Sequence, residues 1–169
     1  ILFISRSDEG NLINLLKQDF EVLVLPKTIK NNNFNKKYLP FNLDQINDAE
    51  KTFELISKSV FKDFNFLLID HYFIDSIWHK HFKNLATNFH HSYKLIVIDD
   101  KANRRHQADI LIDQNYFNSP CKDRYKNLVP EKCIQLLGTK YTMIPSVYKE
   151  LHKVAQPRNS ISRILIFFG

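Results

Sequence analysis

Short, continuously apolar runs alternate with amphipathic segments along this chain, and this alternation restricts its possible folds more than any other feature. The apolar runs lie at 1–5, 21–26, 64–69, 94–99, 108–113, 133–138 and 163–169. The segments between them at 9–19, 43–60 and 75–88 carry apolar residues at helical spacing. Apolar strands that alternate with helices are typical of a parallel sheet covered on both faces. We therefore expect an α/β fold, a Rossmann-like parallel sheet with helices on both faces.

Polar side chains follow three of the expected strands. They are Asp70-His71-Tyr72, Asp99-Asp100 and Asp113-Gln114-Asn115. The carboxyl ends of parallel strands meet at one edge of the sheet, and ligands of such sheets bind outside that edge. The sequence therefore predicts that these side chains gather around one ligand site.

The first cluster has both a structural and a functional interpretation. Asp70 by itself is as well suited to capping the next segment as to binding a ligand. His71 and Tyr72 favour function, because both can hydrogen-bond a polar ligand and both can act as an acid or a base.

The second and third clusters also have both a structural and a functional interpretation. Asp99 and Asp100 precede the sequence KANRRH, so Arg104 and Arg105 can pair with these acids and fix the loop. The acids can equally contact a ligand. Asn115 ends its strand with an amide, which is a common partner of a sugar or ribose hydroxyl.

Charge and glycine content limit the classes of ligand. The net charge of +6 is scattered, and its densest patch, residues 27–37, is rich in Asn and reads as a surface loop. We therefore expect no nucleic-acid partner. The chain has three glycines, none near another, so it lacks a glycine-rich phosphate loop. A nucleotide site needs side chains, or sequence outside these 169 residues.

Metal, thiol and membrane chemistry receive no support from the pattern. The histidine pairs at 79/81 and 90/91 lack metal-ligand spacing, and Cys121 and Cys133 form no CxxC motif. No apolar run has the roughly 18–20 residues of a membrane span. We expect a cytoplasmic protein with reduced cysteines, no metal, no other cofactor and no membrane partner.

Four stretches together resemble one family. They are LLIDHYFIDSIW, LIVIDDKANRRHQADILIDQN, CIQLLGTKYTMI and RILIFFG. In this order and spacing they are similar to the UDP-sugar hydrolases of pseudaminic acid biosynthesis, which are related to spore-coat polysaccharide biosynthesis proteins. The resemblance covers about 64–169, and the earlier residues 3–26 are compatible with it.

The resemblance implies hydrolysis of UDP-2,4-diacetamido-2,4,6-trideoxy-β-L-altropyranose to UDP and the free sugar. It implies a glycosyltransferase-B-type fold of two Rossmann-like domains, with no cofactor. Tyr72 matches a tyrosine at the family's active site and has a supporting catalytic role by this comparison. Asp70, His71, Asp99, Asp100 and Asn115 fall on the substrate-binding side. The oligomeric state stays open.

Parts of the family pattern are missing from this sequence. No residues match the glycine-rich loop with the catalytic histidine, which precedes Ile1 by this comparison. We expect 1–154 to be an N-terminal domain without its first strand, 155–162 an interdomain linker, and 163–169 the first strand of a C-terminal nucleotide-binding domain. The sequence IPSVY at 144–148 also departs from the family's Leu-Arg-Pro-Glu-Phe, which puts one arginine contact in doubt.

Two rival functions explain the same features. A UDP-sugar glycosyltransferase of the same fold binds the same nucleotide and passes the sugar to an acceptor. A non-catalytic Rossmann-like binding module explains the polar strand ends without any chemistry.

Overall fold

The computed structural model describes residues 1–27, 44–89, 92–117, 123–157, 159–161 and 163–166. Most of the Asn-rich segment 27–37, the pair His90-His91, Cys121, part of the expected linker 155–162 and the end of the expected strand 163–169 lie outside the described residues. The predictions made for them therefore stay predictions.

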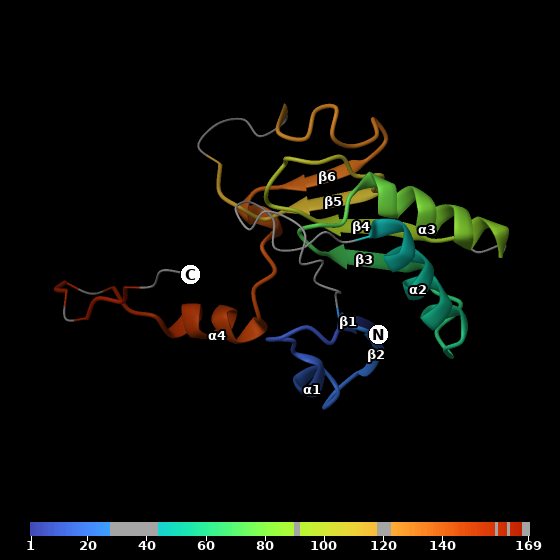
Figure 1. Cartoon of the computed structure of the whole chain (residues 1–169). Helices are drawn as coiled ribbons and strands as arrows, with labels where there is room; N and C mark the ends of the chain where they lie inside the picture. The colour runs from blue at the N-terminus through green and yellow to red at the C-terminus, as the bar shows by residue number, and fades with distance from the viewer. Residues whose placement is uncertain (28–43, 90–91, 118–122, 158, 162, 167–169) are drawn as a thin grey trace, which may run out of the picture.

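Strands and helices alternate as expected over most of the chain (Figure 1). Their order is β1 Leu2–Arg6, α1 Ile13–Leu16, β2 Glu21–Leu25, α2 Gln45–Ser57, β3 Phe66–Asp70, α3 Ser76–Asn88, β4 Lys94–Ile98, β5 Ile110–Asp113, β6 Ile134–Leu137, η2 Thr139–Tyr141 and α4 Ser146–Val154. The helix expected over 9–19 is reduced to the four residues of α1. The sequence analysis did not predict α4.

The two longest described helices begin at acidic capping residues. The Asp44 side chain accepts a hydrogen bond from the Asn47 amide at the start of α2, and Asp75 accepts one from the Ile77 amide at the start of α3. Such caps satisfy backbone donors that have no partner within the helix. Asp44 therefore marks the beginning of the helix within the amphipathic segment 43–60.

All strand pairs are parallel, but the strands form two sheets instead of one. β1 pairs with β2, and the second sheet has the order β3-β4-β5-β6. The prediction of a parallel α/β fold is confirmed, whereas the prediction of one continuous sheet is wrong. The physical reason is that β1 and β3 are not joined by a ladder of backbone hydrogen bonds.

Helices α2 and α3 pack side by side against one face of the four-stranded sheet (Figure 1). Trp78 and Phe82 of α3 join one core with Ile69, Val97 and Leu111 of the strands. The strand register places these three strand residues in one row across the sheet. This face is therefore the apolar core that holds the strand ends in place.

The opposite face of this sheet differs from the expectation. Leu68, Ile96, Ile110 and Ile134 form a row across it, yet Leu68 is 53% and Ile134 58% exposed. No described helix packs over this row, so helices on both faces of the sheet are not found. The apolar strand pattern predicts burial on both sides, but burial also requires a covering element.

The carboxyl-terminal part of the described chain packs little against the rest. None of the α4 residues is buried. Residues 163–166 form no strand, and Ile164, Leu165 and Ile166 are 79%, 91% and 71% exposed. A strand needs a neighbouring strand for its backbone hydrogen bonds, so the prediction that 163–169 begins a second domain stays a prediction. The predicted division into domains stays a prediction.

The longest described helices, α2 and α3, have 13 residues each. Within the described ranges, no helix combines the length and apolar character that a membrane span requires.

Candidate functional site

The three polar clusters lie along one edge of the four-stranded sheet. β3, β4 and β5 are parallel neighbours in register, so their carboxyl ends lie next to one another. Asp70 ends β3, Asp99 follows the last residue of β4, and Asp113 ends β5. The structure thus confirms that the polar residues share one edge, as the strand pattern predicts.

The sequence-predicted residues divide into an exposed group and a buried one. Asp70, His71, Asp100 and Asn115 are exposed, and Tyr72 is 54% exposed. The Lys101 ammonium lies 4.0 Å from the centre of the Tyr72 ring, a cation–π contact that joins the ends of β3 and β4. Asp99, in contrast, is buried. The exposed group faces solvent, where a ligand can reach it.

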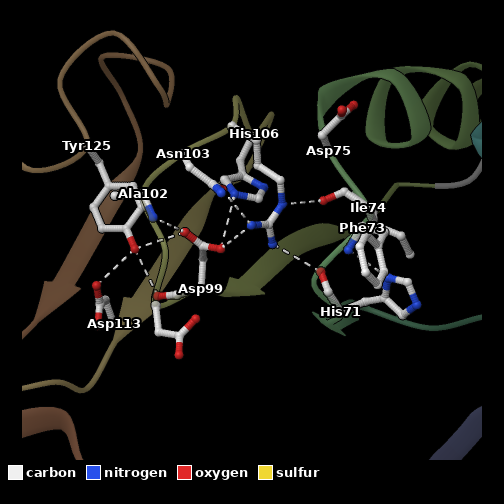
Figure 2. Close-up of polar contacts among 12 residues, drawn as sticks. His71, Phe73, Ile74, Asp75, Asp99, Ala102, Asn103, His106, Asp113 and Tyr125 are labelled. Carbon is white, nitrogen blue, oxygen red and sulfur yellow. Dashed lines mark hydrogen bonds and ion pairs between the residues drawn. The ribbon is translucent and has the colours of Figure 1, made fainter. Parts of the chain in front are cut away.

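Asp99 lies at the centre of a buried polar network (Figure 2). Its Oδ1 forms an ion pair with Arg104 Nη1 at 2.7 Å and lies 3.8 Å from His106 Nε2, while its Oδ2 accepts a 2.9 Å hydrogen bond from the Ala102 amide. Burial alone raises the pKa of Asp99, but the nearby His106 ring, the hydrogen bond from the Ala102 amide and the charge of Arg104 outweigh it and lower the pKa overall. Asp99 therefore stays ionised.

Tyr125 links the ends of β4 and β5. Its buried hydroxyl lies 3.0 Å from Asp99 Oδ2 and 2.9 Å from Asp113 Oδ2, and it donates to one carboxylate at a time. Burial, followed by the charge of Asp99, raises the pKa of Tyr125.

Asp113 has further partners besides Tyr125. Arg124 Nε donates to Asp113 Oδ2 at 2.7 Å. The other Asp113 oxygen accepts from the amide nitrogens of Asn115. Asp113 thereby fixes the backbone that carries Asn115.

Arg104 connects this buried network to the turn after β3. Its Nε donates to the carbonyl oxygen of Ile74 at 3.0 Å, and its Nη2 donates to the carbonyl oxygen of His71 at 3.1 Å. Figure 2 shows Asp99 between Tyr125 on one side and the turn with His71 and Ile74 on the other. The predicted pairing of an acid with Arg104 is confirmed.

The end of β1 lies near the same edge. Arg6, the last residue of β1, forms an ion pair with Asp48 of α2 and donates from Nη1 to the Pro26 carbonyl at 2.7 Å. The pKa of His71 is lowered, first by the partial loss of water around its ring and then by the charges of Arg6 and Arg104. Asp70 and Asp8 act on this pKa in the opposite direction. The two sheets therefore contribute charge to one site.

A pair of buried histidines lies beneath this edge, and the sequence analysis assigned them no role. The rings of His79 and His106 stack with their centres 5.5 Å apart. His79 Nδ1 accepts a hydrogen bond from the Gln107 amide at 3.1 Å. Burial, followed by the charges of His106 and Arg104, lowers the pKa of His79 to about 3. His79 is therefore a neutral packing residue at ordinary pH.

Metal binding and thiol catalysis each require a particular arrangement of side chains. In the part of the chain that the structure describes, no three His, Cys, Asp or Glu side chains gather as a metal site. Cys133 is a buried free thiol, and burial raises its pKa to about 11. A thiol of such high pKa is a poor nucleophile.

The sequence did not predict the residues that bind the buried carboxylates at the carboxyl ends of β4 and β5. Tyr125, Arg124 and His106 carry no motif that separates them from ordinary surface or core residues. Arg124 and Tyr125 lie within the long connection between β5 and β6, so their contacts with Asp113 are long-range contacts that no local pattern predicts. The RRH sequence at 104–106 was the available signal, and it led to Arg104 and Arg105 but not to His106.

Neither protein-family models nor curated proteins give a match to this chain. Its function is therefore argued from the residues and their arrangement.

Proposed function

We propose that this chain is the sugar-binding half of a nucleotide-sugar hydrolase. The substrate is a UDP-linked 2,4-diacetamido-2,4,6-trideoxy sugar, and the products are UDP and the free sugar of pseudaminic acid biosynthesis. In this proposal a second Rossmann-like domain completes a glycosyltransferase-B-type fold and binds uridine. The observation that carries the proposal is the row of exposed polar side chains at the ends of β3, β4 and β5, held by a buried framework.

The exposed residues match the chemistry of a diacetamido sugar. Each acetamido group offers one N–H donor and one carbonyl acceptor. Asp70 and Asp100 are acceptors for N–H and hydroxyl groups, and Asn115 both donates and accepts. His71 and Tyr72 complete the row with groups that can act as acid or base. Asp99 has a buried framework role in the structure, and its substrate contact stays a prediction.

The proposed reaction is a displacement at the anomeric carbon. A water oxygen forms the new C–O bond, the bond to the UDP oxygen breaks, and its electron pair leaves with UDP. The water loses one proton to a general base. The family resemblance assigns this base to a histidine that none of the 169 residues matches, so Tyr72 supports the reaction by orienting the sugar or the water. Donors that stabilise the departing diphosphate belong to the second domain.

Binding to the chain itself is the first test. The free 2,4-diacetamido-2,4,6-trideoxy sugar is titrated into the isotope-labelled 169-residue chain while amide resonances are recorded. We expect shifts at Tyr72, Asp100 and Asn115 and no release of UDP from the UDP-sugar. Absence of shifts along this edge, or UDP release by these residues alone, would overturn the proposal.

The second test separates the hydrolase from its rivals. UDP release is measured from a longer polypeptide that adds the glycine-rich loop and the second domain. Release without any acceptor supports a hydrolase. Release that requires an acceptor sugar identifies a glycosyltransferase, and binding without release identifies a binding module.

A further inference from the structure

The turn between β3 and α3 carries His71 and Tyr72, and residues that follow β4 hold it in place by hydrogen bonds. Arg104 donates to the carbonyl oxygens of His71 and Ile74. The amide of Ser76, the first residue of α3, donates to the Arg105 carbonyl at 2.7 Å. Segment 104–105 thus holds both the turn and the beginning of the following helix.

Arg104 is itself fixed in place from below. Its guanidinium is paired with the buried Asp99 carboxylate, and its side chain is 14% exposed. The second oxygen of Asp99 is occupied by the Ala102 amide and the Tyr125 hydroxyl. Asp99 therefore cannot follow Arg104 if Arg104 moves, and the guanidinium has one well-defined position.

The contacts require the shape of arginine as well as its charge. Three nitrogens of one planar group reach three different acceptors: Nε reaches Ile74, Nη2 reaches His71 and Nη1 reaches Asp99. A lysine ammonium is a compact charge at the end of a flexible stem and lacks this fixed fork. Replacement of Arg104 by Lys keeps the positive charge but cannot preserve all three contacts.

We propose that Arg104 is the positioning residue of this site, because it sets where His71 and Tyr72 stand relative to Asp100 and Asn115. The inference rests on the proposed function only for the ligand that the site binds. The contacts of Arg104 with the turn do not depend on that proposal. Arg104 touches the turn through backbone oxygens, so it acts through the turn and needs no contact with the substrate. The ends of β3 and β4 are thereby joined independently of the ladder between the strands.

The test compares Arg104→Lys with the matched control Arg105→Lys in the 169-residue chain. Arg105 is the exposed neighbour of Arg104. Its replacement makes the same chemical change while the Arg104 hydrogen bonds to His71 and Ile74 remain. We expect Arg104→Lys to shift the resonances of His71, Tyr72 and Phe73 and to remove the proximity signal between the Lys101 side chain and the Tyr72 ring. The core signals of Val97 and Leu111 should stay in place.

Affinity for the free sugar provides a second readout. We expect Arg104→Lys to weaken binding about 10- to 100-fold, because the displaced His71 and Tyr72 would each lose a hydrogen bond to the sugar, and two such losses together have an effect of this size. Arg105→Lys should leave the affinity unchanged. A folded Arg104→Lys chain with unmoved His71 and Tyr72 signals would overturn the inference. If wild-type chain binds no sugar, the proposed function fails, whereas the resonances still decide the role of Arg104.

A measurement on the wild-type chain covers the case in which Arg104→Lys does not fold. Hydrogen exchange of the Arg104 Nε–H is compared with that of the Arg105 Nε–H. The hydrogen bond to Ile74 should slow the exchange of Arg104 about 10-fold or more, consistent with a bond that must open before exchange. Equal exchange rates of the two arginines would contradict the inference.

Discussion

The hydroxyl groups of Tyr125 and Tyr72 show how differently two residues of one type are used at the same edge. Tyr125 is fully buried between two carboxylates, whereas Tyr72 is 54% exposed beside Lys101. The first holds the site together, and the second is available to a ligand. The same substitution at the two positions therefore separates structure from function.

Tyr125→Phe should destabilise the protein. The change keeps the ring but removes the hydroxyl that contacts both Asp99 and Asp113, so a buried carboxylate loses a donor. We expect the free energy of unfolding to fall by about 1.5–3 kcal/mol, the range for a hydrogen bond to a charged group. Denaturant unfolding measures this, with Tyr72→Phe as the control. A loss below about 0.5 kcal/mol would show that the hydroxyl contributes no net stability.

Tyr72→Phe should affect binding and leave stability unchanged. Its hydroxyl can donate to or accept from the sugar or the attacking water, a contact worth about 0.5–3 kcal/mol. In a polypeptide with full activity, kcat/KM should fall about three-fold to a hundred-fold. In the 169-residue chain, the affinity for the free sugar should fall in the same range. Unchanged values in both assays would reduce Tyr72 to a packing residue.

At the scale of elements, the strands of the larger sheet have one covered face and one open face. Ile69 of β3 is 7% exposed and packs beneath α2 and α3, whereas its neighbour Leu68 points to the other face and is 53% exposed. Both residues belong to one apolar run, so the sequence gives no means of telling them apart. The covering helices create the difference.

Alanine substitutions at these adjacent positions test that difference. Ile69→Ala removes buried methyl groups and leaves a cavity, so we expect a loss of about 2–5 kcal/mol in the free energy of unfolding. Leu68→Ala should cost about 1 kcal/mol or less, because much of the side chain stays in water. Chemical unfolding of both variants checks the order. Equal losses would mean that the second face of the sheet is covered in solution.

At the scale of the whole molecule, the buried charges and histidines make stability depend on pH. The folded state disfavours protonation of His79, because burial lowers its pKa from the ordinary 6.5 to about 3. The unfolded chain therefore binds more protons below pH 6.5, and the stability that His79 contributes above this pH is lost as the pH falls toward 3. The lowered pKa of Asp99 acts in the same direction, but below its ordinary value of 3.8.

Between pH 6.5 and 4, we expect the free energy of unfolding to fall by about 2–3 kcal/mol through His79. His79→Gln keeps an acceptor for the Gln107 amide and should remove most of this slope. His81→Gln, on the same helix but only half-buried, serves as the control and should retain it. Urea unfolding across this pH range provides the measurement, and a slope that persists in His79→Gln would contradict the assignment.

The sequence by itself determined most of the local structure and the edge at which the polar residues gather, although it overestimated α1 and missed α4. Apolar runs specify strands, the caps at Asp44 and Asp75 specify helix starts, and parallel strands place their ends together by geometry. These signals act within a few residues of the chain, which is why a single sequence carries them. The pairing of Arg104 with an acid was also predictable, since opposite charges follow one strand within a short loop.

The tertiary structure alone decided which polar groups serve the framework and which reach solvent. Asp70, Asp99 and Asp113 stand at equivalent strand ends, yet Asp70 is exposed and the other two are buried under Tyr125 and Arg104. Two partners of Asp113, Arg124 and Tyr125, come from 11 and 12 residues further along the chain. The separation into two sheets and the open sheet face have the same origin, because hydrogen bonding and burial depend on elements that become neighbours only after the chain has folded.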